Sequence, residues 1–316
     1  MRLSPFFTMR FANRNVFVGL FVALGLVPGS AADLGKSPKG ASAVIESSVP
    51  DVPGDEIFGF TSPSDVGKPG DTGLAIENSG RAGKRDGSYG SITSKVEFSR
   101  TFAENWWIAG SFFNTWHRSV NVTAAPFDHD RIDFDGISTE IVHRIIERSA
   151  SNPIAVSLSF EPRWARVEPV TGIQRDSFTG EVKLFADAVV IPDTLYWGFN
   201  LNWAPAIQQS VPLRSQWVSL SGTNISTALT YQIKPNLLVG GELRWEAAFN
   251  KALFSAYAGQ ALYLGPTLIY KVTDKLALNV VWTPQIEGHA VGAVPGRLDL
   301  DNFERQLFRA KLVMQF

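Results

Sequence analysis

The chain has 316 residues, of which 45 % are hydrophobic and 19 % are charged, so it is not a disordered, charge-rich polymer. It has no cysteine, which excludes disulfides, thiolate metal sites and cysteine nucleophiles, and only four histidines; we expect no metal and no cofactor. The formal net charge of −1 argues against nucleic acid as a partner, whereas 9 Trp and 22 Phe are typical of a protein at a membrane interface.

The first 32 residues have the layout of a secretory signal peptide. Three arginines precede an apolar run from Val16 to Val27, and small residues follow at Ala31 and Ala32. The apolar run is too short to span a bilayer as a helix. We therefore expect a cleaved signal peptide over 1–32, with an uncleaved membrane anchor as the alternative.

Residues 33–71 are interpreted as a periplasmic leader or a plug for a barrel lumen. Up to about Asp55 the segment is rich in Ser, Pro, Ala and Gly, which indicates a flexible connection. The short apolar stretch from Ile57 to Phe60 is expected either to form a short strand or to enter the lumen.

From about Thr72 the chain alternates between apolar and polar residues in segments of roughly ten residues, a spacing typical of membrane barrels. Over Ile154–Phe160, for example, every second side chain is large and apolar, and the residues between them are small or polar. The same period recurs over 195–203, 237–246 and 276–283, and period two with one apolar face predicts half-buried strands. A change of phase near Gly136 predicts a β-bulge.

The connections between these segments alternate in length. Short turns are expected at 104–105, 151–153, 192–193, 234–236 and 273–275. Longer connections are expected at 80–88, 120–130, 166–179, 205–214, 250–258 and 288–302. This pattern predicts an all-β fold, a transmembrane antiparallel up-and-down β-barrel of about 12 strands over 72–316, with both ends on the short-turn, periplasmic side.

A soluble β-sandwich is the alternative fold. Aromatic residues near the expected strand ends favour the membrane barrel, because amphipathic rings prefer the membrane interface. These residues are Trp106, Trp107, Trp116, Trp164, Trp217 and Tyr270.

The segment Phe308–Phe316 places Phe308, Ala310, Leu312, Met314 and Phe316 on one face. It resembles the closing strand of Gram-negative outer-membrane proteins, which the barrel assembly machinery recognises. The resemblance implies an outer-membrane location, contact with outer-membrane lipid, and the assembly machinery as a partner. In it, Phe308, Leu312, Met314 and Phe316 would form the assembly signal.

A second resemblance rests on residues 262–284, with Gly265-Pro266-Thr267 near one end and Trp282-Thr283-Pro284 at the other. This region is similar to outer-membrane barrels of a poorly characterised transporter group that includes the phenol-degradation meta-pathway type. The resemblance implies passage of small molecules, apolar ones included, and it assigns no site residue.

The polar faces of the expected strands supply seven acids and seven bases to the lumen. Charges in a low-dielectric wall are paired or hydrated, so they form either a bracing ionic network or a constriction that selects solutes. The pair Glu161 and Arg163 is expected to meet Glu181 and Lys183 across one connection. The fourteen residues are Lys95, Glu97, Glu140, Arg144, Glu161, Arg163, Glu181, Lys183, Asp187, Glu242, Arg244, Glu246, Arg309 and Lys311.

Two loops carry further candidate groups. The acidic stretch 128–135, with Asp128, His129, Asp130, Asp133 and Asp135, is expected to be a solvated loop, with weak Ca²⁺ binding by its oxygen ligands as the alternative. The basic residues Arg81, Lys84 and Arg85 either touch lipopolysaccharide phosphates or are ordinary solvated charge.

Evidence for catalysis is weak. His117 and His143 lie on neighbouring expected strands, with Ser111 and Ser138 nearby, but no serine sits in a recognisable elbow. We therefore expect no enzyme. The sequence favours an outer-membrane channel for passive transport of small molecules through a narrow polar lumen. A non-conducting structural or adhesion barrel is the first alternative, and a barrel lipid hydrolase the second.

Overall fold

The computed structural model describes residues 56–123, 125, 127–149, 151–169, 171–210, 214–292 and 296–316. The predicted signal peptide and the leader up to residue 55 lie outside these residues. Within the described ranges, no helix has the length and apolar character needed to cross a membrane.

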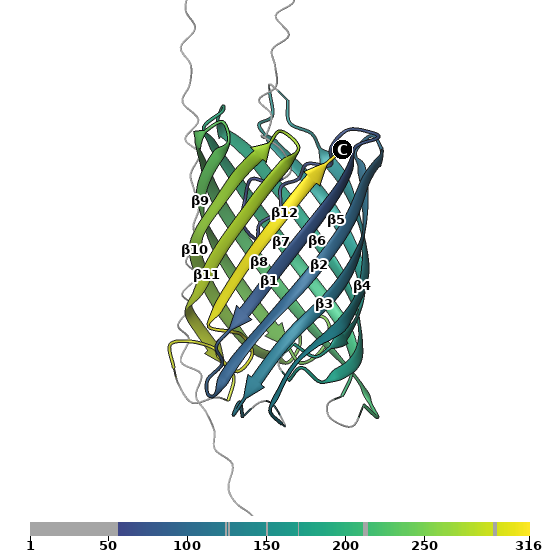
Figure 1. The fold of residues 1–316 in the computed structure, drawn as a ribbon, viewed down its shortest axis with the longest axis vertical. Coiled ribbons are helices and arrows are strands. Elements are labelled where there is room, and N and C mark those ends of the chain that lie inside the picture. The colour runs from purple at the N-terminus through teal and green to yellow at the C-terminus, as the bar shows by residue number, and fades with distance from the viewer. Residues whose placement is uncertain are drawn as a thin grey trace, which may run out of the picture. The chain divides into compact units, whose positions relative to one another are not determined.

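Twelve strands in the described part of the chain form a closed antiparallel barrel, as the sequence predicted (Figure 1). Each strand pairs with its neighbours in chain order, and β1 pairs with β12 to close the wall. The strands are β1 (Thr72–Ala82), β2 (Ser88–Ala103), β3 (Trp106–Val120), β4 (His129–Ile146), β5 (Ile154–Val167), β6 (Gln174–Ile191), β7 (Leu195–Gln209), β8 (Trp217–Lys234), β9 (Leu237–Phe249), β10 (Tyr257–Thr273), β11 (Leu276–Ala290) and β12 (Gln306–Gln315).

At the rim where β12 ends, the upper rim in Figure 1, four of the five connections are short turns, and the fifth, between β4 and β5, covers 147–153 where only 151–153 was expected. The connections at the opposite rim are longer than those four turns. We call these the short-turn rim and the long-loop rim.

Two predicted connections are misplaced. The expected 166–179 is too long, because β5 runs to Val167 and β6 begins at Gln174, and the expected 205–214 starts too early, because β7 runs to Gln209 and β8 begins at Trp217. Residues 174–179 at the start of β6 are mostly polar, so they lack the apolar alternation that marks a strand in the sequence. They are nevertheless paired with β5, as Ser177 is with Ala165.

The outer face of the barrel is apolar. On β2 and β3, Phe98 and Phe112 are 57 % and 54 % exposed, and on β5 Leu158 and Phe160 alternate with buried serines. Burying a side chain of this size removes roughly 1.5–3 kcal/mol of unfavourable contact with water, so a surface built of them suits hydrocarbon. Closure of the sheet leaves no unpaired edge, as a lipid environment requires.

The predicted bulge in β4 is confirmed. Phe113 pairs with Gly136 and Asn114 pairs with Phe134, so Asp135 is the extra residue. Gly136 has a φ of 151°, and a Cβ there would lie 1.9 Å from the Trp164 carbonyl oxygen, so a side chain does not fit.

Candidate functional site: the barrel lumen

Residues 56–66, called here the inner segment, lie inside the barrel and follow its wall. At its start, Glu56 forms ion pairs with Lys311 and, at 3.8 Å, with Arg309 of β12. Asn279 of β11 donates a hydrogen bond to the Glu56 carboxylate at 3.2 Å and another to the Phe58 carbonyl. The segment therefore begins against β11 and β12.

The middle of the inner segment is held by β8 and β9. The Thr61 backbone N–H donates to Glu242 Oε2 at 3.1 Å, and the Thr61 hydroxyl donates to Ser226 Oγ at 2.9 Å. Glu242 is fully buried and has no ion pair among the described residues, so its carboxylate serves mainly as a backbone acceptor here.

The last part of the inner segment contacts β4, β5 and β6. The Ser64 N–H donates to Asp187 at 2.5 Å, and Ser157 Oγ donates to the Ser64 carbonyl at 2.5 Å. Asp65 lies 3.3 Å from the Arg144 guanidinium. Polar wall side chains thus satisfy backbone groups that no strand ladder reaches.

Apolar contacts fill one side of the lumen. Ile57 and Phe58 are buried in a cluster with Tyr196, Leu238 and Ile269 of the wall. Gly198 on β7 makes room for Phe58, since a Cβ there would lie 2.7 Å from its ring. The stretch Ile57–Phe60 was expected either to form a short strand or to enter the lumen, and in the structure it lies in the lumen.

The connection between β11 and β12 enters from the long-loop rim. Phe303 packs with Tyr263, Leu307 and Phe60 of the inner segment. The Tyr263 hydroxyl donates to the Glu304 carbonyl at 2.9 Å. The side of the lumen near β10 is therefore packed from both rims.

The basic residues near the long-loop rim are ion-paired rather than free. Lys84 lies 2.9 Å and Arg81 3.6 Å from Glu304, and Arg85 lies 2.7 Å from Asp301. Burial raises the pKa of Glu304, but the two bases outweigh it and lower that pKa below its ordinary value. Ion pairing was not among the expectations for this cluster, and the Arg81 and Arg85 side chains are still 50 % and 39 % exposed.

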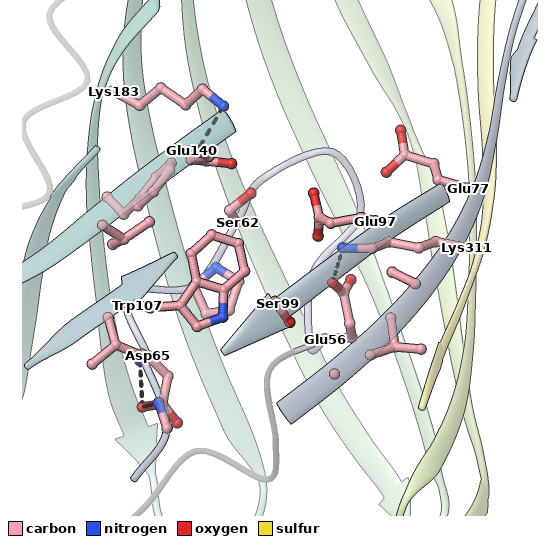
Figure 2. A pocket seen from close by; sticks show the side chains of 18 of the residues that line it. Glu56, Ser62, Asp65, Glu77, Glu97, Ser99, Trp107, Glu140, Lys183 and Lys311 are labelled. Atoms are coloured by element: carbon pink, nitrogen blue, oxygen red, sulfur yellow. Dashed lines mark hydrogen bonds and ion pairs between the residues drawn. The ribbon is translucent and has the colours of Figure 1, made fainter. Parts of the chain in front are cut away.

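A cavity of about 270 Å³ remains between the inner segment and the wall formed by β12, β1 to β4, β6 and β7. It extends from the short-turn rim at Thr72 and Gln315 to mid-lumen at Glu77 and Glu181. Figure 2 shows charged side chains on both sides of this space, with the Trp107 ring facing into it.

All fourteen charged residues taken from the sequence lie on the inner face, where nearly all of them form ion pairs. Lys183 contacts Glu140 at 3.2 Å, Glu181 at 3.5 Å and also Glu161, so the expected cross-strand pair with Glu161 forms. Arg163 pairs with Asp135 at 2.6 Å instead of Glu181, because the bulge turns Asp135 inward.

Other lumenal pairs are Lys95 with Glu97 at 2.9 Å, Arg309 with Glu77 at 3.7 Å, and Arg244 with Glu246. The buried Asp187 pairs with Arg148. These contacts fit the bracing network that was one of the two expectations for the lumenal charges.

A family model matches residues 50–316, most of the chain. The chain belongs to DUF6662, a family of unknown function. No curated protein matches it.

The DUF6662 barrel is similar to several solved structures at low identity. The NanC porin is 13 % identical, with a TM-score of 0.45, over 76 % of this chain and 98 % of that one. The KdgM porin is 12 % identical, with a TM-score of 0.42, over 77 % and 99 %. The Pseudomonas putida toluene transporter TodX is 9 % identical, with a TM-score of 0.39, over 82 % and 95 %.

Several lumenal residues of the DUF6662 barrel were not expected from the sequence, among them Glu77 of β1, which lines the cavity. Glu56 and Asp65 belong to the inner segment, and Asp135 lies at the bulge. Trp107 was placed with the interfacial aromatics, which is wrong: Trp106 faces outward, and Trp107 lines the cavity. The small residues at Ala109 and Ser111 share the face of Trp107 and could have indicated its orientation.

The acidic stretch near residue 130 is not a loop, since β4 begins at His129. Asp130 pairs with Arg118 at 3.0 Å on the outer face, whereas Asp133 and Asp135 pair with Arg131 and Arg163 inside. Alternation along a strand therefore separates carboxylates that a loop could have gathered. The described residues contain no group of three or more acids and histidines placed to hold a metal ion.

The two histidines considered for catalysis lie on opposite faces of the wall. His117 points inward, with Nδ1 2.6 Å from His129 Nε2 and Nε2 3.0 Å from the Pro169 carbonyl. His143 stacks on the outward Trp106. A shared site for the lipid-hydrolase alternative is therefore not formed at this pair.

Proposed function

We propose that this DUF6662 chain is an outer-membrane channel through which small molecules pass passively along the lumen. One observation carries the proposal: a charged, polar cavity of about 270 Å³ lies inside a closed barrel whose outer face is apolar. Outer-membrane lipid would contact the apolar face, with lipopolysaccharide around the long-loop rim.

The inner segment is proposed as a displaceable plug, which gives the predicted leader 33–71 a role. It is held by hydrogen bonds and ion pairs to wall side chains and by the packing of Ile57 and Phe58, rather than by a strand ladder. The polar contacts can exchange for water without opening the barrel wall. Displacement of the segment would widen the path that the cavity now occupies.

The outward residues Phe308, Leu312 and Met314 of β12, together with Phe316 directly after it, are proposed as the signal that the barrel assembly machinery recognises. All four are exposed on the outer face, with Phe316 62 % exposed. Because β12 pairs with β1 to close the barrel, the assembly machinery would recognise β12 at the stage of folding in which the wall closes.

The test is the conductance of the purified full chain in a planar lipid bilayer. We expect discrete steps, and we expect Ser99→Trp, which fills the cavity from β2, to lower the step size by about twofold. Phe98→Trp is the matched control, because this neighbour on β2 faces outward and should leave conductance unchanged. No step at any voltage would remove the channel and favour a non-conducting barrel.

A further inference from the structure

We propose that the cavity selects small organic cations, specifically solutes with a primary ammonium beside a short apolar group. The proposal rests on the proposed channel function and specifies its substrate class. It is argued from three features of the cavity: its charge, its apolar wall and its size.

The cavity is lined by more acids than bases. Seven carboxylates face four basic side chains among its described lining residues, which leaves an excess of three negative charges. Adding the two adjoining charges, Arg144 and Glu161, leaves that excess unchanged. In a space bounded by a low-dielectric wall, this imbalance attracts cations and repels anions.

The excess is greatest around Lys183. Its single ammonium lies within 4 Å of three carboxylates, Glu140, Glu161 and Glu181. Glu140 and Glu181 line the cavity, and the Glu181 side chain is 29 % exposed, so it is open to a solute. A second ammonium placed here would gain charge-assisted hydrogen bonds from carboxylates that share one lysine.

An apolar wall adjoins these carboxylates. Val66 of the inner segment packs with Val142, Phe185 and Trp107. Val142 lies directly opposite Trp107 in the β3–β4 pairing and two residues from Glu140 on the same face. Figure 2 shows the Trp107 ring facing the cavity below Glu140 and Lys183. A solute with its ammonium at Glu140 would therefore lay its apolar part on this ring and its neighbours.

The volume sets the size of the solute. At about 270 Å³ the cavity is slightly smaller than pockets that take drug-sized ligands. A short alkyl or aryl amine fits both this volume and the separation of charged and apolar lining, whereas a bare inorganic ion would leave the apolar wall unused.

Isothermal titration of the purified full chain in detergent tests the proposal with three probes of equal size: butylammonium, butyrate and butanol. We expect butylammonium to bind with at least tenfold higher affinity than the other two, about 1.4 kcal/mol. The double variant Glu140→Gln/Glu181→Gln should abolish that preference. In this variant Lys183 still pairs with Glu161, so its charge is not left unpaired in the lumen. Trp107→Ala should weaken butylammonium about three- to tenfold.

Glu246→Gln is the matched control, because Glu246 is a lumenal carboxylate that pairs with Arg244 and does not line the cavity. Equal binding of butyrate, or no binding of butylammonium, would overturn the proposal even if the barrel conducts. Binding of butylammonium without conductance would support the cation site and remove the channel. In a conducting barrel, a reversal potential that favours chloride over potassium would also overturn the proposal.

Discussion

Asp187 on β6 links the inner segment to the wall at a single buried carboxylate. It accepts a hydrogen bond from the Ser64 N–H at 2.5 Å and pairs with Arg148. Because Asp187 and Arg148 are both buried, Asp187→Ala should lower the free energy of unfolding by about 3–5 kcal/mol, measured by urea titration of tryptophan fluorescence in detergent.

Asp187→Asn is the control for that change. The amide oxygen can still accept from Ser64, while the charge opposite Arg148 is lost, so the decrease in stability should be smaller than for alanine. Equal stability of wild type and Asp187→Ala would show that neither contact contributes to the fold.

Glu304 should make the free energy of unfolding fall as the pH becomes acidic. Lys84 and Arg81 hold its pKa below the ordinary 4.5, so the folded state binds fewer protons than the unfolded state near that pH. The contribution is therefore complete above about pH 4.5 and is lost as the pH falls through the lowered pKa. We expect the stability difference between wild type and Glu304→Gln to shrink between pH 7 and pH 3 in urea titrations.

Glu287→Gln serves as the comparison for Glu304, since Glu287 is an exposed carboxylate on β11. Its difference from wild type should stay near zero over the same range. A Glu304→Gln difference that is constant with pH would mean that the ion pairs with Lys84 and Arg81 do not stabilise the folded state.

At the scale of elements, the inner segment can be locked by a disulfide. The hydroxyl oxygens of Thr61 and Ser226 lie 2.9 Å apart, and the chain has no other cysteine to compete. In the variant Thr61→Cys/Ser226→Cys, oxidation should hold the segment against β8 and keep conductance low. Reduction should restore the wild-type step size, because the segment can then leave the wall.

The control staple joins two strands that are already paired. Thr93 and Thr115 face each other on β2 and β3 with their hydroxyl oxygens 3.0 Å apart, so Thr93→Cys/Thr115→Cys should conduct equally in both redox states. If the staple at Thr61 also has no effect on conductance, the inner segment is a fixed part of the wall and not a plug.

The strands could be predicted from the sequence, but the inner segment could not be placed. Strands such as β5 alternate apolar and polar residues because one face meets an apolar surrounding and the other the lumen. The inner segment has no such period, since its backbone bonds go to side chains of distant strands, as from Thr61 to Glu242. Nothing in the local sequence indicates which wall residue will accept such a bond.

At the scale of the whole molecule, the sequence predicted the closed barrel of twelve strands and the charged lumen, but not the unequal filling of that lumen. Tyr263 and Leu238 are inward and fully buried, although the alternation marks them only as lumenal. They are buried because the inner segment and the connection after β11 pack on them, and those contacts join residues far apart in the chain. The position of the cavity depends on these packing contacts.

Assembly of the whole barrel can be tested at β12. Phe316 and Phe102 are both outward, at 62 % and 54 % exposed, and both lie near the short-turn rim. Replacing either by serine should cost about 2 kcal/mol of lipid contact, so that loss is common to the two variants. If β12 carries the assembly signal, Phe316→Ser should strongly reduce the amount of folded, heat-modifiable barrel in the outer-membrane fraction, while Phe102→Ser stays near wild type. Equal reductions in both variants would mean that the apolar face of β12 acts only through lipid contact.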